Sequence, residues 1–163
     1  MFHYCSKITQ LNVNSFNTKE LVDMSFMFAD LRTVSSLDLS KFYTSKVKTM
    51  AHLFQWNNNL KNLKIPNFDT SKVTDMSFFV QGWRNLVSFD LNSFDTKNVI
   101  TMESMFQDCG SLTYLNLSNF VTNEVRDISS MFKWYVSLKS LDISNFVTDK
   151  VKIWAIYLDI VKI

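Results

Sequence analysis

The stretch FDLNSFDTKNVITMESMFQDCGSLTY, residues 89–114, decides the fold of this chain. Shifted by 26 residues in either direction, it falls on a near copy of itself. The start of the unit recurs, without insertion or deletion, at Leu11, Leu37, Leu63, Phe89, Leu115 and Leu141. Six starts in one register identify a tandem repeat, in which a unit buries its apolar faces only against its neighbours.

The repeat organises residues 1–163 as a single repeat domain. Residues 1–10 match the second half of a unit, and residues 11–140 form five full units. Residues 141–163 begin as a sixth unit and then diverge. Because neither end resembles the polar cap of a solenoid, we expect a piece of a longer array, or ends that meet other subunits.

Two periodicities alternate within each unit. Leu115 and Leu117 alternate with polar neighbours, which is typical of a strand with one buried face. The stripe of an amphipathic helix follows, with apolar residues at Val125, Ile128, Met131, Phe132, Tyr135 and Leu138. Asp127 stands where the helix N-cap is expected. The sequence therefore predicts an α/β, leucine-rich-repeat-like solenoid of 26-residue strand-turn-helix coils with a continuous parallel sheet.

Two columns of the repeat are invariant in type. Phenylalanine recurs at Phe16, Phe42, Phe68, Phe94, Phe120 and Phe146, which predicts an aromatic spine in the core. Threonine recurs at Thr18, Thr44, Thr70, Thr96, Thr122 and Thr148, and we expect it to bond the turn backbone of its own or the next coil.

The two cysteines, Cys5 and Cys109, share one column and lie four periods apart. At a strand spacing of roughly 4.8 Å, about 19 Å would separate them. A disulfide needs Cα atoms within about 7 Å, so both are predicted to be free thiols.

Composition and motifs exclude several functions. A net charge of +2, with basic and acidic residues interleaved, argues against a nucleic-acid track. No stretch approaches the ~18 apolar residues of a membrane span, and the first residues do not resemble a secretory signal. His3 and His52 have no partners at metal-ligand spacing, and neither a phosphate loop nor a Gly-x-Ser-x-Gly elbow occurs. We therefore expect no enzyme activity, no catalytic residues, no cofactor and no metal site.

Candidate partner-binding residues are those that vary between units. The polar positions of the predicted strand face are Asp38, Lys64, Asp90 and Asn116, with one aromatic residue beside them, Tyr114. Trp56 and Trp134 share a column of the variable loop, three coils and so roughly 14 Å apart. Exposed tryptophans either pack locally or meet a partner, and both alternatives stay open here. Trp83 lies in the neighbouring column and is predicted to point inward.

The repeat LxLSxFxTxxVxxMxxMFxxCxSLxx strongly resembles the bacterial surface protein 26-residue repeat, found among BspA-like leucine-rich-repeat proteins and in listerial and mycoplasma surface lipoproteins. Residues 89–114 and 115–140 carry the pattern almost intact. The resemblance implies a leucine-rich-repeat-like solenoid displayed outside the cell or on its surface. It also implies a role in adhesion or in binding host molecules, with no catalytic residues.

These observations together predict a non-enzymatic surface module for adhesion that recognises a protein or glycan on a host or neighbouring cell. The alternative is a structural spacer, or a unit that assembles end to end, without a dedicated ligand. Charged substitutions at Ile156 or Ile160 would weaken such end-to-end assembly.

Overall fold

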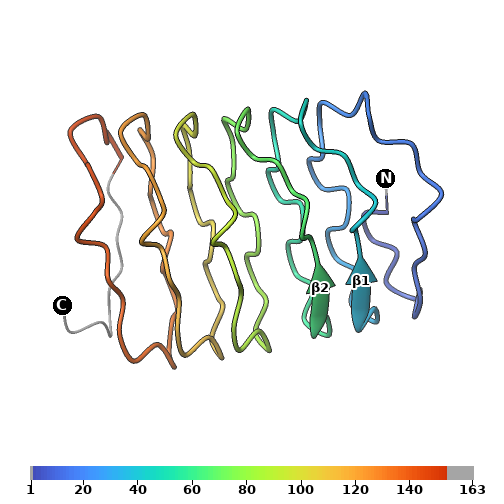
Figure 1. Cartoon of the computed structure of the whole chain (residues 1–163). Coiled ribbons are helices and arrows are strands. Elements are labelled where there is room, and N and C mark those ends of the chain that lie inside the picture. The colour runs from blue at the N-terminus through green and yellow to red at the C-terminus, as the bar shows by residue number, and fades with distance from the viewer. Residues whose placement is uncertain (1, 154–163) are drawn as a thin grey trace.

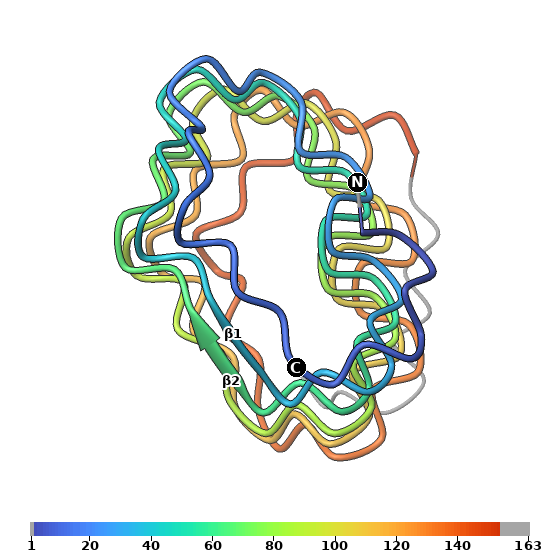
Figure 2. The same ribbon diagram turned by 90° about the vertical axis from the view of Figure 1, so that its right-hand side faces the viewer.

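The computed structural model describes residues 2–153, which wind into a stack of closely similar coils (Figure 1). Seen along the stack, successive coils superpose around a common interior (Figure 2), which buried apolar side chains fill. The predictions for the divergent terminal segment, including Ile156 and Ile160, lie outside the described residues.

Regular secondary structure is sparse. Strand β1 (Ser36–Asp38) pairs in parallel with strand β2 (Asn62–Lys64), in the register that places Leu37 beside Leu63. Residues 2–153 contain no helix and no strand other than β1 and β2, and the remaining pairing between coils consists of isolated single-residue bridges. The prediction of an α/β, leucine-rich-repeat-like solenoid of strand-turn-helix coils with a continuous parallel sheet is therefore wrong.

The segment predicted to be helical is instead a series of tight turns that bond to the next coil. In the coil that begins with Leu37, four N–H groups donate to carbonyls of the following coil over 2.8–3.0 Å, at Met50, His52, Phe54 and Trp56. An α-helix would direct these groups to carbonyls four residues back in the same segment. Turns between Met50 and Leu53, and between His52 and Gln55, repeat at a spacing that imitates the helical stripe.

Two residues of each complete coil in this segment adopt the left-handed conformation. The first column contains Phe26, His52, Phe78, Ser104 and Ser130, with φ between 51° and 57°. The second contains Tyr4, Asp30, Trp56, Gly82, Asp108 and Trp134, with φ between 59° and 78°. This conformation costs an ordinary L-residue about 1–2 kcal/mol, and here hydrogen bonds between coils hold it in place.

Asp127, expected as a helix N-cap, has a related role in a turn. Its Oδ1 accepts a hydrogen bond from the N–H of Ser129 over 2.8 Å, two residues ahead. A short side-chain acceptor that bonds nearby backbone N–H groups serves a turn as well as a helix start. The residue type was therefore compatible with both structures.

The core agrees with several sequence predictions. The repeated phenylalanines are buried at Phe42, Phe68, Phe94 and Phe120, but Phe16 is partly exposed. Ring stacking runs along a neighbouring column, in which Phe28 lies between Phe2 and Phe54 with centroid distances of 5.8 and 6.0 Å. Trp83 is buried, as predicted. Cys5 and Cys109 are free, also as predicted.

The threonine column links each coil to the next. The hydroxyl of Thr96 accepts a hydrogen bond from the N–H of Val121 over 2.8 Å and donates one to the carbonyl of the same residue over 3.1 Å. The same pair of bonds recurs from Thr44, Thr70 and Thr122. This confirms the predicted bonding role and assigns it to the next coil.

Candidate functional site

The regular pairing of coils is interrupted on the face that carries β1 and β2. Beyond β2, the next bridge recorded at this column within residues 2–153 is the pair Leu115 and Leu141. On the other side of the coils, bridges follow one another without a gap from Asp23 to Ile153. The interruption therefore affects one face, where, among the described residues, the coil that begins with Phe89 pairs with neither neighbour and no bridge is recorded at Leu11.

Two bulky residues account for the interruption. Phe89 replaces the leucine that starts every other unit, and Trp83 occupies the column of the cysteines. The indole of Trp83 is buried and donates its Nε1–H to the carbonyl of Phe54, and its ring centroid lies 5.9 Å from that of Phe89. The two rings need more room than most of the residues they replace, and they lie where the coils that begin with Leu63 and Phe89 do not pair on this face.

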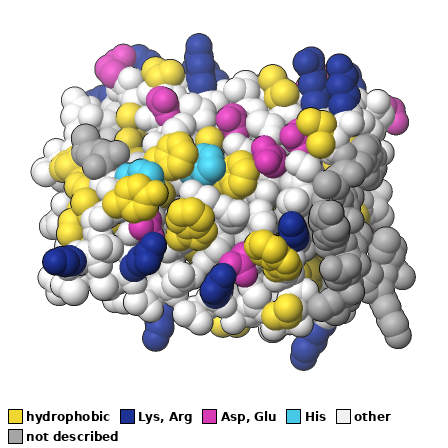
Figure 3. Space-filling view, turned by 180° about the vertical axis from the view of Figure 1, so that it is seen from behind, with side chains coloured by type: hydrophobic (Ala, Val, Ile, Leu, Met, Phe, Trp, Pro, Cys, Tyr) yellow, Lys and Arg dark blue, Asp and Glu magenta, His cyan; other side chains and the backbone are white. Residues whose placement is uncertain are grey.

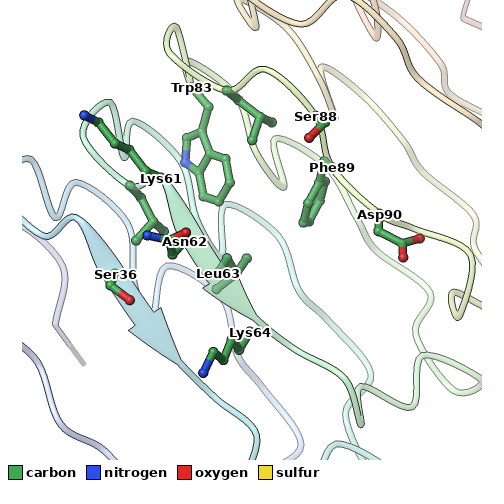
Figure 4. A pocket seen from close by; sticks show the side chains of 11 residues that line it. Ser36, Lys61, Asn62, Leu63, Lys64, Trp83, Ser88, Phe89 and Asp90 are labelled. Carbon is green, nitrogen blue, oxygen red and sulfur yellow. The ribbon is translucent and has the colours of Figure 1, made fainter.

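A groove occupies the space between these coils (Figure 4). It comprises a cavity of about 450 Å³ and an adjoining cavity of about 500 Å³, and both are lined by Leu63, Lys64, Phe89 and Asp90. We call these two cavities the strand-face groove. Volumes of this size fall within the range of ligand sites.

The walls of the strand-face groove differ in charge. Lys61 and Lys64 project from the side of β2, and Asp90 stands on the opposite coil (Figure 4). The ammonium of Lys64 also lies 3.7 Å from Asp38. Between these charges lie the apolar side chains of Leu63 and Phe89. The groove therefore combines an apolar floor with charges of both signs at its rim.

The edge of β2 that faces this groove lacks a strand partner among the described residues. The N–H of Asn62 donates to Ser35, and the carbonyl of Lys64 accepts from Leu39, so both groups point towards β1. Backbone groups alternate in direction along a strand, which turns the N–H and carbonyl of Leu63 towards the groove. An unpaired strand edge of this kind is able to pair with an extended peptide.

The predicted strand-face residues have turn-forming roles as well. Asp38, Asp90 and Asn116 each accept the N–H of the residue two positions ahead, over 2.9–3.0 Å. Hydrogen bonds from the Ser40 hydroxyl and N–H lower the pKa of Asp38. The structure brings Lys64 and Asp90 together at the groove, whereas Asn116 lies outside its lining.

The predicted aromatic residues are exposed and separate from the groove. Tyr114 lies one residue before Leu115 and is exposed. Trp56 and Trp134 occupy the second left-handed column, three coils apart, and are also exposed. Trp56 packs locally over Gly82, and the ammonium of Lys133 lies 4.6 Å from the ring centroid of Trp134. Each tryptophan therefore has a local contact and also an exposed surface that a partner could reach.

The opposite face carries an exposed aromatic column that includes both histidines (Figure 3). The imidazole of His52 lies between the rings of Phe26 and Phe78, with centroid distances of 4.1 and 4.4 Å and nearly parallel planes. Partial burial is the main cause that lowers the pKa of His52. Gln55 lies 3.0 Å from its Nδ1 and continues a ladder of glutamine amides through Gln81.

Sequence reasoning missed several residues of these surfaces. Lys61 and Phe89 line the strand-face groove, but neither was predicted as a binding residue, whereas Ser88 belongs to the polar face expected on an open sheet. The available signal was the departure of Trp83 and Phe89 from their columns. No group of three or more metal-ligating side chains occurs within residues 2–153, and no helix there is long and apolar enough to cross a bilayer.

Comparison with protein families matches residues 1–82 and 56–159 to the family described as Mycoplasma protein of unknown function, DUF285. The chain belongs to this family. The two matches overlap at residues 56–82, as a repeated sequence allows. Membership agrees with the resemblance to bacterial repeat proteins that include mycoplasma members, whereas the coils do not have the expected leucine-rich-repeat structure. Comparisons with curated proteins and with solved structures gave no match.

Proposed function

We propose that this member of the family is a non-enzymatic binding module, and that its strand-face groove recognises an extended segment of a partner protein. The observation that supports this proposal is the interruption between β2 and the coil of Phe89, which leaves the backbone groups of Leu63 facing a groove. Added-strand binding supplies affinity through the main chain, and side chains at the rim supply specificity. Lys64 and Asp90 would select the charges of the bound segment.

The module is proposed to act at the cell surface, in adhesion to a host or neighbouring cell. Support comes from the resemblance to bacterial surface repeat proteins and from membership of a mycoplasma family. Protease treatment of intact cells, followed by detection of the chain, tests this location. Loss of the chain from intact cells supports it, and protection until the cells are lysed contradicts it.

The binding proposal is tested by capture of the purified chain on immobilised matrix proteins and overlapping peptides. The informative variant exchanges the charges of the groove, Lys64→Glu with Asp90→Lys, and leaves the net charge unchanged. Its matched control is Lys72→Glu with Asp142→Lys, because Asp142 forms the same type of turn as Asp90. We expect the groove variant alone to lose capture, and equal capture by both variants would exclude the groove.

A rigid spacer is the second candidate function, and one observation favours it. Hydrogen bonds from the threonine column and the turn segment connect each coil to the next through most of the described chain. A stack connected in this way resists bending and holds its ends at a constant separation. Absence of capture by the unmodified chain across the whole panel would favour this function over binding.

A further inference from the structure

A second cavity, separate from the strand-face groove, lies beside the second left-handed column. Its volume is about 280 Å³. The residues that line it come from four successive coils and are Arg32, Trp56, Asn58, Gly82, Arg84 and Asp108. We call it the Trp56 cleft. Arg32, Asn58 and Arg84 occupy the same position in consecutive coils, which places an amide between two guanidinium groups.

Gly82 holds the indole of Trp56 in place. A Cβ atom added to Gly82 would lie 2.3 Å from Cδ1 and 3.0 Å from Nε1 of Trp56, so only glycine permits this contact. Trp56 nevertheless remains 40% exposed. An indole fixed against the backbone and still open to solvent is a preformed surface on which the apolar face of a ring can stack.

Both arginines are oriented by aspartates that lie deeper in the protein. Arg32 Nε lies 2.6 Å from Asp30, whose side chain is only 2% exposed, whereas the Arg32 side chain is 62% exposed. Arg84 Nε and Nη2 lie 2.9 and 2.8 Å from Asp108, and its side chain is 69% exposed. The negative charges are therefore the more buried members of each pair, and the guanidinium groups face the solvent.

Asn58 adds donors between the two guanidinium groups. Its Oδ1 accepts the N–H of Arg84 over 3.3 Å, which assigns the oxygen and nitrogen of the amide. Within the described part of the chain, no acceptor is recorded for Nδ2. The terminal nitrogens of Arg32 likewise keep donors beyond the Nε contact with Asp30. These donors suit an oxyanion, and guanidinium groups bind carboxylates and sulfates especially well.

We propose that the Trp56 cleft binds an acidic sugar residue of a glycan, with its carboxylate or sulfate between Arg32, Asn58 and Arg84 and its ring against Trp56. The cleft is smaller than most ligand sites, which fits one sugar residue better than a longer segment. Its donors match an anion, while its indole matches the apolar face of a sugar ring. This inference rests on the proposed function in one respect, that the chain is a binding module. The Trp56 cleft shares no lining residue with the strand-face groove, so the two sites can be tested separately.

Titration of the full chain with defined oligosaccharides tests this inference. The probes are sialyllactose as the carboxylated sugar, a heparin tetrasaccharide as the sulfated sugar, lactose as the neutral sugar and a short glutamate peptide as the acidic peptide. Binding of either acidic sugar, with much weaker binding of lactose and of the peptide, supports the inference. The preferred acidic sugar then identifies the anion. Equal binding of the peptide, or binding of neither acidic sugar, overturns it.

Variants locate the bound sugar. Asn58→Asp keeps the acceptor for Arg84 and adds a negative charge between the guanidinium groups, so we expect affinity to fall about tenfold or more. Asn123→Asp is the matched control, because Asn123 is exposed and lies outside the cleft lining. Arg32→Gln with Arg84→Gln is expected to have an effect at least as large.

The groove variant separates the two proposals. Lys64→Glu with Asp90→Lys should leave sugar binding unchanged, since neither residue lines the Trp56 cleft. Equal losses in the Asn58 and Asn123 variants, or loss in the groove variant, would overturn the assignment to the cleft. Failure of protein capture, with sugar binding intact, would overturn only the function proposed for the groove.

Discussion

Thr96→Val removes the hydroxyl that connects two coils while it preserves the shape of the side chain. Thr96 is only 1% exposed, and its hydroxyl bonds both the N–H and the carbonyl of Val121. An unpaired buried polar group costs about 1–3 kcal/mol. Because Val121 as a residue is 42% exposed, we take the lower end of this range, about 1–1.5 kcal/mol, for each of its two backbone groups. The expected loss of unfolding free energy is therefore about 2–3 kcal/mol.

The measurement is urea unfolding followed by circular dichroism, with the variant and the unmodified chain compared at one temperature. The midpoint should fall, and the dependence of the unfolding free energy on urea should stay the same. Thr113→Val is the matched control, because Thr113 is exposed, and its effect should stay within about 0.5 kcal/mol. A loss of less than about 0.5 kcal/mol for Thr96→Val would refute the bonding role derived for the threonine column.

Three further predictions concern the core, the turns and the thiols. Phe94→Ala should lower the unfolding free energy by about 3–5 kcal/mol, while Asp95→Ala in the adjoining turn should lower it much less. Equal losses for the two variants in urea unfolding would contradict the assignment of Phe94 to the core. Ser130→Gly should stabilise the chain by up to about 1 kcal/mol in the same assay, because φ is 56° there, and clear destabilisation would contradict the left-handed assignment. Cys109 should resist a thiol reagent at neutral pH until the chain unfolds, because burial raises its pKa to about 12, while the partly exposed Cys5 reacts first. Equal native reaction rates, measured by absorbance of the released product, would contradict this burial.

The sequence was sufficient for those features that depend on the register of the repeat. A constant period of 26 residues places Thr96 level with Thr122 and therefore beside Val121, so a bond from the threonine column to the turn backbone was predictable, although the choice of the next coil was not. Burial of Phe94 and the free state of Cys109 follow from the same argument. These features depend on which residues are neighbours between coils, and the period alone determines that.

The helix prediction failed because two backbone structures share the same apolar spacing. Consecutive tight turns place inward residues three or four positions apart, as a helix does. The difference lies in the left-handed residues, and glycine, the usual signal for that conformation, occupies only Gly82 among them. Residues such as Phe26 and Trp134 gave no local sign of it, because bonds to the neighbouring coil stabilise their conformation.

The candidate sites were predictable only in part, for a related reason. Lys64 and Asp90 were identified as variable polar positions, but the groove between them depends on the volumes of Trp83 and Phe89. Trp56 was identified from its type, whereas its contact with Gly82 crosses from one coil to the next. Grooves and clefts on a regular stack form where adjacent units carry residues that differ from the repeat consensus. A consensus pattern does not record these differences.

The threonine bonds also bear on how such a protein changes during evolution. The hydroxyls of Thr44, Thr70, Thr96 and Thr122 each bond the following coil at the same separation of 25 residues. Duplication or loss of a whole unit by recombination would therefore rejoin matching surfaces and require no compensating substitutions. The boundary between the coils of Leu63 and Phe89 is different, since its groove exists only when those two units are adjacent. Selection on array length and selection on this groove can thus proceed independently, provided that crossovers spare that one junction.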